Sequence, residues 1–520
     1  MLKSQTVIPF GISKDSIYPD FVNVDGAITS QEWVKKHTMY FYKPTSYNSL
    51  TSPILFAMHG EGGDGLGPIN DLINIADRRG ALIIGINFYY SGSTGLHTAS
   101  YGFIDSLNQC VDEGPATKLI AAMYKHTMQR ESRNSVPVYM IGFSAGGQFV
   151  SRYMLIRQAY PDSVPIKMAV STNPYYYTFP TDTFNGVPMP WLSGLIFNDW
   201  VTQYISAGSC PEIAQYYTFK CPDHIKQYYN ENYGVLIGTG DTTPLSDNAS
   251  AMAQGSNRYQ RAQTFYNFGL SDAPNFGTSL NWKYREVIGV GHDQYNMYNS
   301  KNLPTDTFTI AERLLFDTPY NPKIQYAPVA SFTSDVISTS LPSATVSFTN
   351  NSFGATVYEW DFGDGNTSTI TNPVHTYTNA ASTTTVNNAN GTFTVAGQYF
   401  MVQLKATSVS GCSNWDVKRH YIRVLPDMTT NANELSLYNY DLQIIPNPTS
   451  EEAIILVQNL KERADLNIEI YNYSGQLVQK IKEINVVSSK LDTRTYSSGI
   501  YFIKVKYKDK MQTMKLIVQH

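Results

Sequence analysis

The sequence predicts an α/β domain with a mostly parallel central sheet, followed by two smaller all-β domains. Residues 1–322 alternate apolar strand segments with helical segments, a pattern typical of a parallel sheet covered by helices on both faces. Residues 327–426 and 438–520 carry short segments of alternating polarity between turn residues, which predict β-sandwiches. We expect the polar segment 427–437 to be a linker. A chain of 520 residues is also too long for one ordinary core.

The expected elements of the first domain follow one another along the chain. Apolar segments predict strands at residues 37–44, 53–60, 81–88, 136–142, 166–172, 233–240 and 284–291. Helical patterns predict helices at residues 69–80, 112–130, 148–159 and 258–269. Residues 175–230 interrupt this alternation, and we expect them to be an insertion that forms a partial lid.

Composition and charge exclude several classes of protein. Only 15% of the residues are charged and 42% are hydrophobic, so the chain is globular. A net charge of -4 gives no support for binding to nucleic acids or anionic membranes. No apolar run approaches the roughly 20 residues that a transmembrane helix needs. The composition therefore directs attention to motifs within the α/β domain.

A serine stands between two glycines where a predicted strand meets a predicted helix. The segment Gly142-Phe143-Ser144-Ala145-Gly146 has the pattern G-x-S-x-G, known as the nucleophile elbow. Its small residues let the backbone turn sharply and present the serine. Ser144 is therefore a candidate nucleophile, and the alternative is a small turn residue without a chemical role.

A serine nucleophile needs a base and an acid that orients the base. His292 directly follows the last predicted strand and Asp241 follows the strand before it, which is where open α/β sheets place functional groups. We expect His292 to be the base and Asp241 the acid. In the alternative interpretation, His292 bonds to turn backbone and Asp241 stabilises an Asx turn. Rival carboxylates that follow no apolar run directly are Asp247, Asp272 and Asp293.

The same reaction needs donors for a developing oxyanion. We expect one from the amide of Ala145, which follows the nucleophile, and another from the glycine-rich segment "HGEGG" after an early strand, at Gly60 or Glu61. A phosphate loop or a simple turn is the alternative for "HGEGG", although the spacing of a Walker motif is absent.

Together these motifs carry a resemblance to a known family. On "HGEGG", "GFSAGG", "GTGD" and "GVGH", residues 35–317 resemble the α/β-hydrolase superfamily, in the branch of polyhydroxybutyrate-depolymerase-like and feruloyl-esterase-like enzymes. The resemblance implies a serine esterase with a Ser-His-Asp triad and an acyl-enzyme intermediate, without cofactor or metal. The alternatives are a serine peptidase, which uses the same triad, and a catalytically silent adhesin or glycan-binding surface protein.

Aromatic residues suggest a substrate class. Trp191, Trp200 and Tyr176 belong to the insertion, and Tyr89 and Tyr90 follow another predicted strand. Aromatic faces bind aryl groups with little loss of side-chain entropy, so we expect a cleft for polymeric or aryl esters of the polyester, polyhydroxyalkanoate or feruloyl type. In the alternative, these rings form the small core of the lid.

The cysteine pattern predicts one disulfide. The chain has four cysteines, too few for a disulfide-dense scaffold, and no pair has C-x-x-C spacing. Cys210 and Cys221 flank the loop-like segment "CPEIAQYYTFKC". We expect these two to be bonded to each other, and two free thiols are the alternative.

The second region resembles a PKD domain, an immunoglobulin-like sandwich of secreted and surface proteins. The resemblance rests on "YEWDFGDGN", "NPVHTY" and "AGQYFMVQLKATSVSG". Trp360 and Phe362 should face its core, and Asp361 and Asp364 should be turn residues, with calcium binding as the alternative. An additional Thr/Asn-rich stretch, "TNAASTTTVNNANGTFT", predicts a loop or an extra hairpin.

The last region resembles the C-terminal sorting domain of type IX secretion cargo. The motifs are "IIPNPTSEEAIIL", "IEIYNYSGQLV" and "SSGIYFIKV". The resemblance implies a secreted or cell-surface protein whose partner is the type IX secretion machinery. Such cargo first crosses the inner membrane with a signal peptide, and "MLKSQTVIPFGIS" lacks the apolar segment of one. We therefore expect a signal peptide to have been removed.

Overall fold

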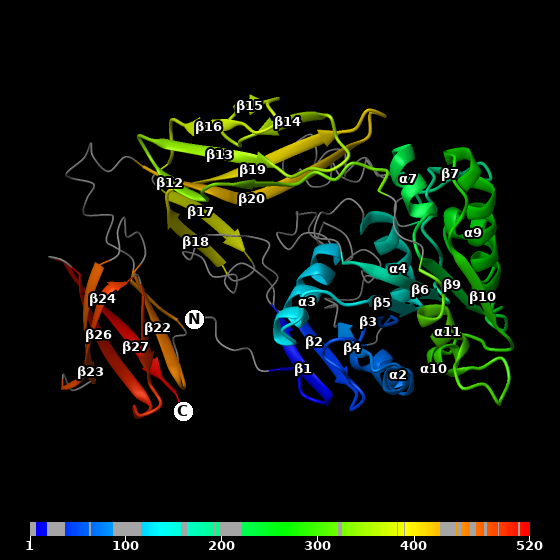
Figure 1. Ribbon diagram of the computed structural model, residues 1–520, viewed down its shortest axis with the longest axis horizontal. Helices are drawn as coiled ribbons and strands as arrows, with labels where there is room; N and C mark the ends of the chain where they lie inside the picture. Colours follow the sequence, from blue (N-terminus) through cyan, green and yellow to red (C-terminus); the bar gives the residue numbers. More distant parts are fainter. Residues whose placement is uncertain are drawn as a thin grey trace. The chain divides into compact units, whose positions relative to one another are not determined.

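Figure 1 shows the computed structural model of the chain. It describes residues 7–17, 37–61, 64–86, 116–157, 164–190, 193–196, 220–320, 325–381, 383–388, 391–426, 442–445, 449–457, 464–472, 476–486, 488–507 and 510–519. Contacts group the α/β domain and the first sandwich into one compact unit, and Leu425–His520 form most of a second. The predicted linker 427–437 lies outside the described residues.

The first domain is built on an eight-stranded sheet with the order β1-β2-β4-β3-β5-β6-β9-β10. Strands β1 and β2 are antiparallel to their neighbours, and the pairs from β4 to β10 are parallel. This confirms the predicted mostly parallel sheet. The strands are β1 Gly11–Ile17, β2 His37–Lys43, β3 Ile54–Met58, β4 Leu82–Ile86, β5 Val138–Phe143, β6 Ile166–Thr172, β9 Tyr233–Gly238 and β10 Lys283–Val287.

Helices cover both faces of this sheet (Figure 1). Successive side chains of a strand point to opposite faces, so Phe56 enters the core cluster beneath α3, α4, α7 and α9, whereas Leu55 enters the cluster with α2, α10 and α11. Both side chains are fully buried. The helices are α2 Leu66–Arg79, α3 Ala116–Arg130, α4 Ala145–Ile156, α7 Pro222–Tyr229, α8 Ala249–Gln254, α9 Arg258–Asp272, α10 Gln294–Asn299 and α11 Ile310–Phe316, with a 3₁₀ turn at Ala273–Phe276.

The described part of the predicted insertion contains a short hairpin, β7 (Thr183–Phe184) with β8 (Val187–Pro188), and helix α7. Its aromatic residues are partly core residues. Tyr177 stacks on Phe265 of α9 at a centroid distance of 4.4 Å, and Phe179 packs edge to face on the same ring. Both are fully buried, so these two rings stabilise the domain and offer no face to a ligand.

The second region is a two-sheet sandwich. Its sheets have the orders β11-β13-β16 and β12-β20-β19-β14-β15, and Trp360 and Phe362 are buried between them as predicted. The Thr/Asn-rich stretch adds the hairpin β17–β18. The strands are β11 Phe332–Ser334, β12 Ser338–Ser340, β13 Ala344–Asn350, β14 Val357–Asp361, β15 Thr367–Ser368, β16 Val374–Tyr377, β17 Thr383–Asn388, β18 Gly391–Ala396, β19 Gln398–Thr407 and β20 Ser413–Leu425.

Asp361 and Asp364 accept hydrogen bonds within the turn that follows β14. Asp361 accepts a hydrogen bond from the amide of Gly363 at 2.8 Å, and Asp364 accepts one from the amide of Asn366 at 3.0 Å. Asp364 also accepts from His375 Nε2 at 2.8 Å. Both carboxylates thus bond to amides two residues further along the turn, as turn residues do. No cluster of three or more metal-ligating side chains occurs among the described residues.

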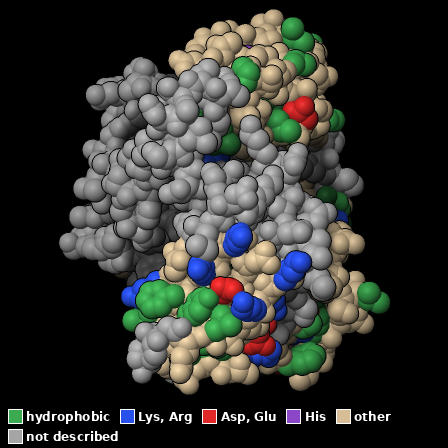
Figure 2. Space-filling model, turned by 90° about the vertical axis from the view of Figure 1, so that its left-hand side faces the viewer, with side chains coloured by type: hydrophobic (Ala, Val, Ile, Leu, Met, Phe, Trp, Pro, Cys, Tyr) green, Lys and Arg blue, Asp and Glu red, His purple; other side chains and the backbone are tan. Residues whose placement is uncertain are grey.

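The last region is a smaller sandwich of the sheets β21-β22-β25 and β24-β23-β26-β27. Its core is aliphatic and aromatic, and Ile455, Ile470 and Ile503 are fully buried. Figure 2 shows Lys and Arg side chains interspersed with acidic and hydrophobic ones on one face of the molecule. Lys480 and Glu469 of this region form an ion pair at 2.7 Å. The strands are β21 Leu442–Ile445, β22 Glu452–Val457, β23 Ala464–Asn472, β24 Leu477–Val486, β25 Ser488–Asp492, β26 Gly499–Tyr507 and β27 Lys510–Val518.

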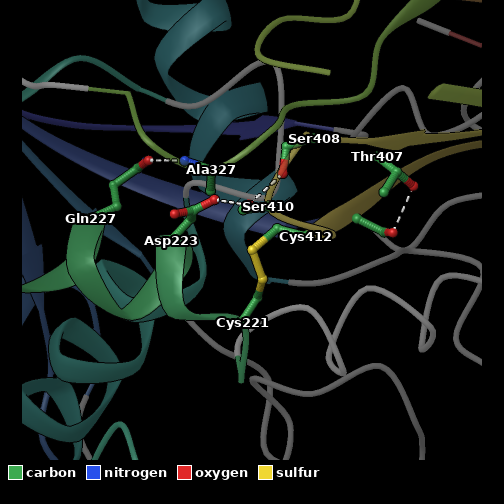
Figure 3. Close-up of a disulfide and its surroundings, with 9 residues drawn as sticks. Cys221, Asp223, Gln227, Ala327, Thr407, Ser408, Ser410 and Cys412 are labelled. Atoms are coloured by element: carbon green, nitrogen blue, oxygen red, sulfur yellow. Dashed lines mark hydrogen bonds between the residues drawn. A yellow bond between two sulfur atoms is a disulfide. The ribbon is translucent and has the colours of Figure 1, made fainter. Parts of the chain in front are cut away.

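The predicted disulfide between Cys210 and Cys221 is wrong. Cys221, at the start of α7, bonds instead to Cys412 in the loop between β19 and β20, 191 residues along the chain (Figure 3). A disulfide requires Cα atoms about 4.4–6.8 Å apart, and the fold brings these two to 5.7 Å. Proximity in sequence does not decide that distance. Cys210 lies outside the described residues.

Candidate active site

The backbone at Ser144 turns sharply between β5 and α4. Ser144 has φ 55° and ψ -116°, a conformation that L-residues rarely adopt and that projects the side chain beyond the sheet. Helix α4 begins at Ala145, earlier than the predicted start at Gln148. The turn needs glycine beside it, because a Cβ atom at Gly146 would lie only 2.3 Å from the carbonyl oxygen of Met58. This packing explains why small residues surround the serine.

The loops after β9 and β10 are hydrogen-bonded to each other. The amide of Gly240 donates to the carbonyl of Val290 at 2.9 Å, and the amide of Gly289 donates to Thr239 Oγ1 at 2.8 Å. The loops approach so closely that a Cβ atom at Gly238 would lie 2.2 Å from the Val290 oxygen. The segments "GTGD" and "GVGH" therefore fold as one unit, and the residues that end them lie side by side.

The structure brings together three of the residues singled out in the sequence. His292 Nε2 lies 3.2 Å from Ser144 Oγ, and His292 Nδ1 lies 2.8 Å from Asp241 Oδ2. Asp241 is 1% exposed, whereas about a third of the His292 side chain reaches solvent. Phe143 supports the imidazole at a ring-centroid distance of 4.6 Å. A buried carboxylate thus holds a solvent-accessible base beside a hydroxyl group.

Asn173 is a site residue that sequence analysis missed. It follows β6, is fully buried, and has the left-handed φ of 45°. Its Nδ2 donates to Asp241 Oδ2 at 2.7 Å and to the carbonyl of Gly291 at 3.3 Å, so it connects the acid with the loop that carries His292. The signal in the sequence was its position directly after a buried strand, the same criterion that selected Asp241 and His292.

The surroundings of Asp241 favour its ionised form. Burial opposes ionisation, but hydrogen bonds from His292 and Asn173, together with the positive charge of Arg258, outweigh it and lower the pKa of Asp241 below its ordinary value. The carboxylate therefore stays charged in the pH range in which histidine titrates, and it can orient a histidine proton.

Two of the predicted oxyanion residues, Ala145 and Gly60, lie next to the serine. Ala145 is the first residue of α4, so its amide lies among the N-terminal amides that lack a partner within the helix. A Cβ atom at Gly60 would lie 3.5 Å from Ser144 Cβ, which places Gly60 directly against the nucleophile. His59 Nδ1 contacts the carbonyl oxygen of Gly60 at 2.7 Å, and Glu61 is exposed.

The rival carboxylates have other contacts. Asp293 caps α10 by accepting from the amide of Asn296, and Asp272 accepts from the hydroxyl of Tyr229. Asp247 accepts from the neighbouring amide of Asn248. The carboxylate that accepts the hydrogen bond from His292 is thus Asp241, which directly follows a strand.

Of the expected substrate-binding residues, Tyr176 is 9% exposed and packs edge to face on Tyr175 at 6.1 Å. Four further residues proposed for substrate binding lie outside the described residues, namely Tyr89, Tyr90, Trp191 and Trp200.

Comparisons with family models identify the two trailing domains. Residues 325–382 match a model described as a PKD domain, and residues 443–519 match one described as a secretion system C-terminal sorting domain. Both predicted resemblances are confirmed, and the sorting domain marks the chain as a secreted or cell-surface protein. Within the described ranges, no helix is long and apolar enough to cross a membrane. No curated protein matches the chain significantly.

Solved structures similar to this chain include several hydrolases. A poly(3-hydroxybutyrate) depolymerase from Bordetella parapertussis is 23% identical over 60% of this chain and 92% of its own, with a TM-score of 0.44. Poly(aspartic acid) hydrolase-1 from Sphingomonas sp. KT-1 is 20% identical over 56% and 96%, with a TM-score of 0.43. An S-formylglutathione hydrolase from Agrobacterium tumefaciens is 12% identical over 56% and 92%, with a TM-score of 0.33.

Proposed function

We propose that the chain is a secreted serine hydrolase that cleaves carboxylic esters through an acyl-enzyme intermediate. The observation that carries the proposal is the continuous series of contacts from Ser144 Oγ through the His292 ring to Asp241, at 3.2 and 2.8 Å. A serine hydroxyl is a weak nucleophile until an adjacent base takes its proton. The strained turn at Ser144 and the buried, ionised Asp241 support the same assignment.

In the proposed reaction, Ser144 Oγ attacks the ester carbonyl carbon while His292 Nε2 accepts the hydroxyl proton. Asp241 keeps the Nδ1 proton of His292 in place and balances the positive charge of the ring. Amides of Ala145 and of Gly60 or Glu61 donate to the oxyanion. His292 then gives its proton to the leaving alcohol oxygen, and a water molecule, activated by the same base, hydrolyses the acyl-enzyme. These steps require no cofactor or metal.

We further propose polymeric or aryl esters, such as polyesters, polyhydroxyalkanoates or feruloyl esters, as the substrates. The sorting domain supports this choice, because an exported enzyme meets substrates that are too large to enter a cell. Tyr175 adds an aromatic ring near the site, since it packs against Arg258, which lies 3.6 Å from Asp241.

A fluorophosphonate probe tests the proposal directly. The wild-type protein should be labelled, whereas Ser144→Ala should not be, and its kcat on p-nitrophenyl butyrate should fall on the order of 10⁶-fold. Replacement of an exposed serine, Ser271→Ala, is the matched control and should change neither readout. Hydrolysis by Ser144→Ala at near wild-type rate would refute the assignment, and an unlabelled wild-type protein would indicate a catalytically silent surface protein.

A substrate panel tests the ester class. Soluble p-nitrophenyl esters, feruloyl esters and polyester films should be cleaved, and feruloyl or polymeric substrates should be preferred per mole of ester. Peptide p-nitroanilides should be poor substrates. Faster turnover of the anilides than of the esters would show that the chain is a serine peptidase instead.

A further inference from the structure

One oxygen of the buried Asp241 carboxylate has no hydrogen bond. His292 and Asn173 both donate to Oδ2, whereas Oδ1 is buried and accepts none from the described residues. A charged oxygen that loses water without gaining a donor is costly to bury. The nearest cation is Arg258, whose Nη1 lies 3.6 Å from Oδ1 in the ion pair of these two residues.

Arg258 stands at an unusual place for a cation. It is the first residue of α9, directly after the capping residue Asn257, where the helix dipole favours negative charge. No acidic residue occupies this first turn. A residue that breaks a local preference without a local benefit often marks a functional position. Among the described residues, Arg258 forms an ion pair only with Asp241.

Neighbouring residues hold Arg258 in this position. The Tyr175 ring lies 5.2 Å from the guanidinium carbon of Arg258. Two hydrogen bonds hold Tyr175: its hydroxyl donates to the carbonyl of Ser246 at 3.2 Å, and Arg261 donates to the Tyr175 carbonyl at 2.6 Å. The amide of Tyr259 donates to the backbone carbonyl of Asp241 at 3.2 Å. The first turn of α9 thus contacts Asp241 twice, through the backbone hydrogen bond of Tyr259 and through the ion pair of Arg258.

We propose that Arg258 is a positioning residue for the base of the proposed hydrolase: its guanidinium balances the charge on Asp241 Oδ1 and so sets the pH at which His292 loses its proton. A cation near a carboxylate weakens the attraction of that carboxylate for a proton on the adjacent imidazole. The inference rests on the proposed function for its catalytic consequence, but the ion pair of Arg258 with Asp241 is present in the folded protein without substrate, so its electrostatic effect should be measurable there.

Other charged or titratable groups also lie around this carboxylate. His292 faces it from the loop after β10, and the Tyr177 phenol, which follows β6, is buried nearby, with its pKa raised mainly by burial. Arg261 and Asp247 interact with each other, and Arg261 also feels the charge of Arg258. Among these groups, two residues pair with Asp241, namely His292 and Arg258.

The test compares pH profiles of kcat/KM for four proteins. In Arg258→Met the acid limb should move to higher pH by about one unit, because the cation is lost. Arg258→Lys keeps the charge and should leave the limb within a few tenths of a unit of the wild type. Arg285→Met removes an exposed arginine from β10 and should not move the limb. If Arg258 had a purely structural role, Arg258→Met would lower the melting temperature but leave the acid limb of the kcat/KM profile at the wild-type pH.

A second readout separates this inference from the proposed function. In a Ser144→Ala background, the His292 ring is titrated by NMR with and without Arg258→Met, and with Arg258→Gln if the Met variant does not fold. The protonation midpoint should rise in the neutral variants. A midpoint unchanged within about 0.2 units would overturn the role of Arg258 even if the enzyme is an esterase. Conversely, the rise would stand even if the substrate panel refuted the esterase assignment.

Discussion

The disulfide between Cys221 and Cys412 should contribute strongly to the attachment of the PKD domain to the α/β domain. The perturbation is the double variant Cys221→Ser/Cys412→Ser, which avoids leaving one thiol unpaired. The noncovalent contacts around the bond include the hydrogen bond that Asp223 accepts from Ser410 and those that Gln227 Oε1 accepts from the amides of Tyr326 and Ala327 at 3.0 and 3.1 Å (Figure 3). Each such bond contributes only about 1 kcal/mol.

The magnitude follows from the length of chain that the bond closes. With a sequence separation of 191 residues, the chain-entropy model gives a stabilisation of about 5 kcal/mol at 25 °C, which is an upper value because native-state effects reduce it. We therefore expect the double variant to lose about 2–5 kcal/mol of unfolding free energy. This exceeds the loss expected for Ser410→Ala, which removes the hydrogen bonds of that hydroxyl to Asp223 and Ser408 and keeps the disulfide.

Urea unfolding followed by tryptophan fluorescence measures this loss, and peptide mapping without reductant identifies the bonded cysteines. The m-value should also rise in the double variant, because an unfolded chain without the cross-link exposes more surface. An unfolding free energy within about 0.5 kcal/mol of the wild type would refute the calculation. A peptide map in which Cys221 is bonded to a cysteine other than Cys412 would refute the pairing itself.

Three further predictions concern the active site. Gly146→Ala should cost about 3 kcal/mol of stability, because the added Cβ atom would lie 2.3 Å from the Met58 carbonyl oxygen. Gly67→Ala is the control and should be tolerated, since no atom lies within 4 Å of its Cβ position. The melting temperatures of the two variants, each compared with the wild type, test this difference. Asn173→Ala should lower kcat by about 10- to 100-fold through the lost hydrogen bond to the charged Asp241, and steady-state kinetics with unchanged kcat would contradict this. Because the pKa of Asp241 is lowered by folding, its ionisation stabilises the protein above the ordinary carboxyl pKa of about 4, and this contribution is lost as the pH falls through the lowered value. The stability difference between wild type and Asp241→Asn, measured by urea unfolding, should therefore shrink in acid; a constant difference down to pH 2 would contradict the linkage.

Sequence alone predicted seven of the eight strands of the central sheet and three candidate site residues, but not strand β1 or helices α7, α8, α10 and α11. Strands such as β3 and β4 are fully buried, so they appear as continuous apolar runs that need no tertiary information to recognise. The positions of Ser144, Asp241 and His292 followed from one rule, that the carboxyl ends of parallel strands meet at one edge of the sheet. The structure places His292 within hydrogen-bonding distance of both Ser144 and Asp241.

Only the tertiary structure decided which residues support that site and which cysteines pair. Cys221 bonds to a residue 191 positions away, and no local pattern encodes such a distance. Asn173 and Arg258 reach Asp241 from β6 and α9, and their side-chain types are compatible with ordinary turn and surface positions. Tyr177, which the sequence could assign to a binding cleft, is core because α9 covers it. Local propensity and periodicity depend on neighbours along the chain, whereas pairing, burial and electrostatic balance depend on neighbours in space.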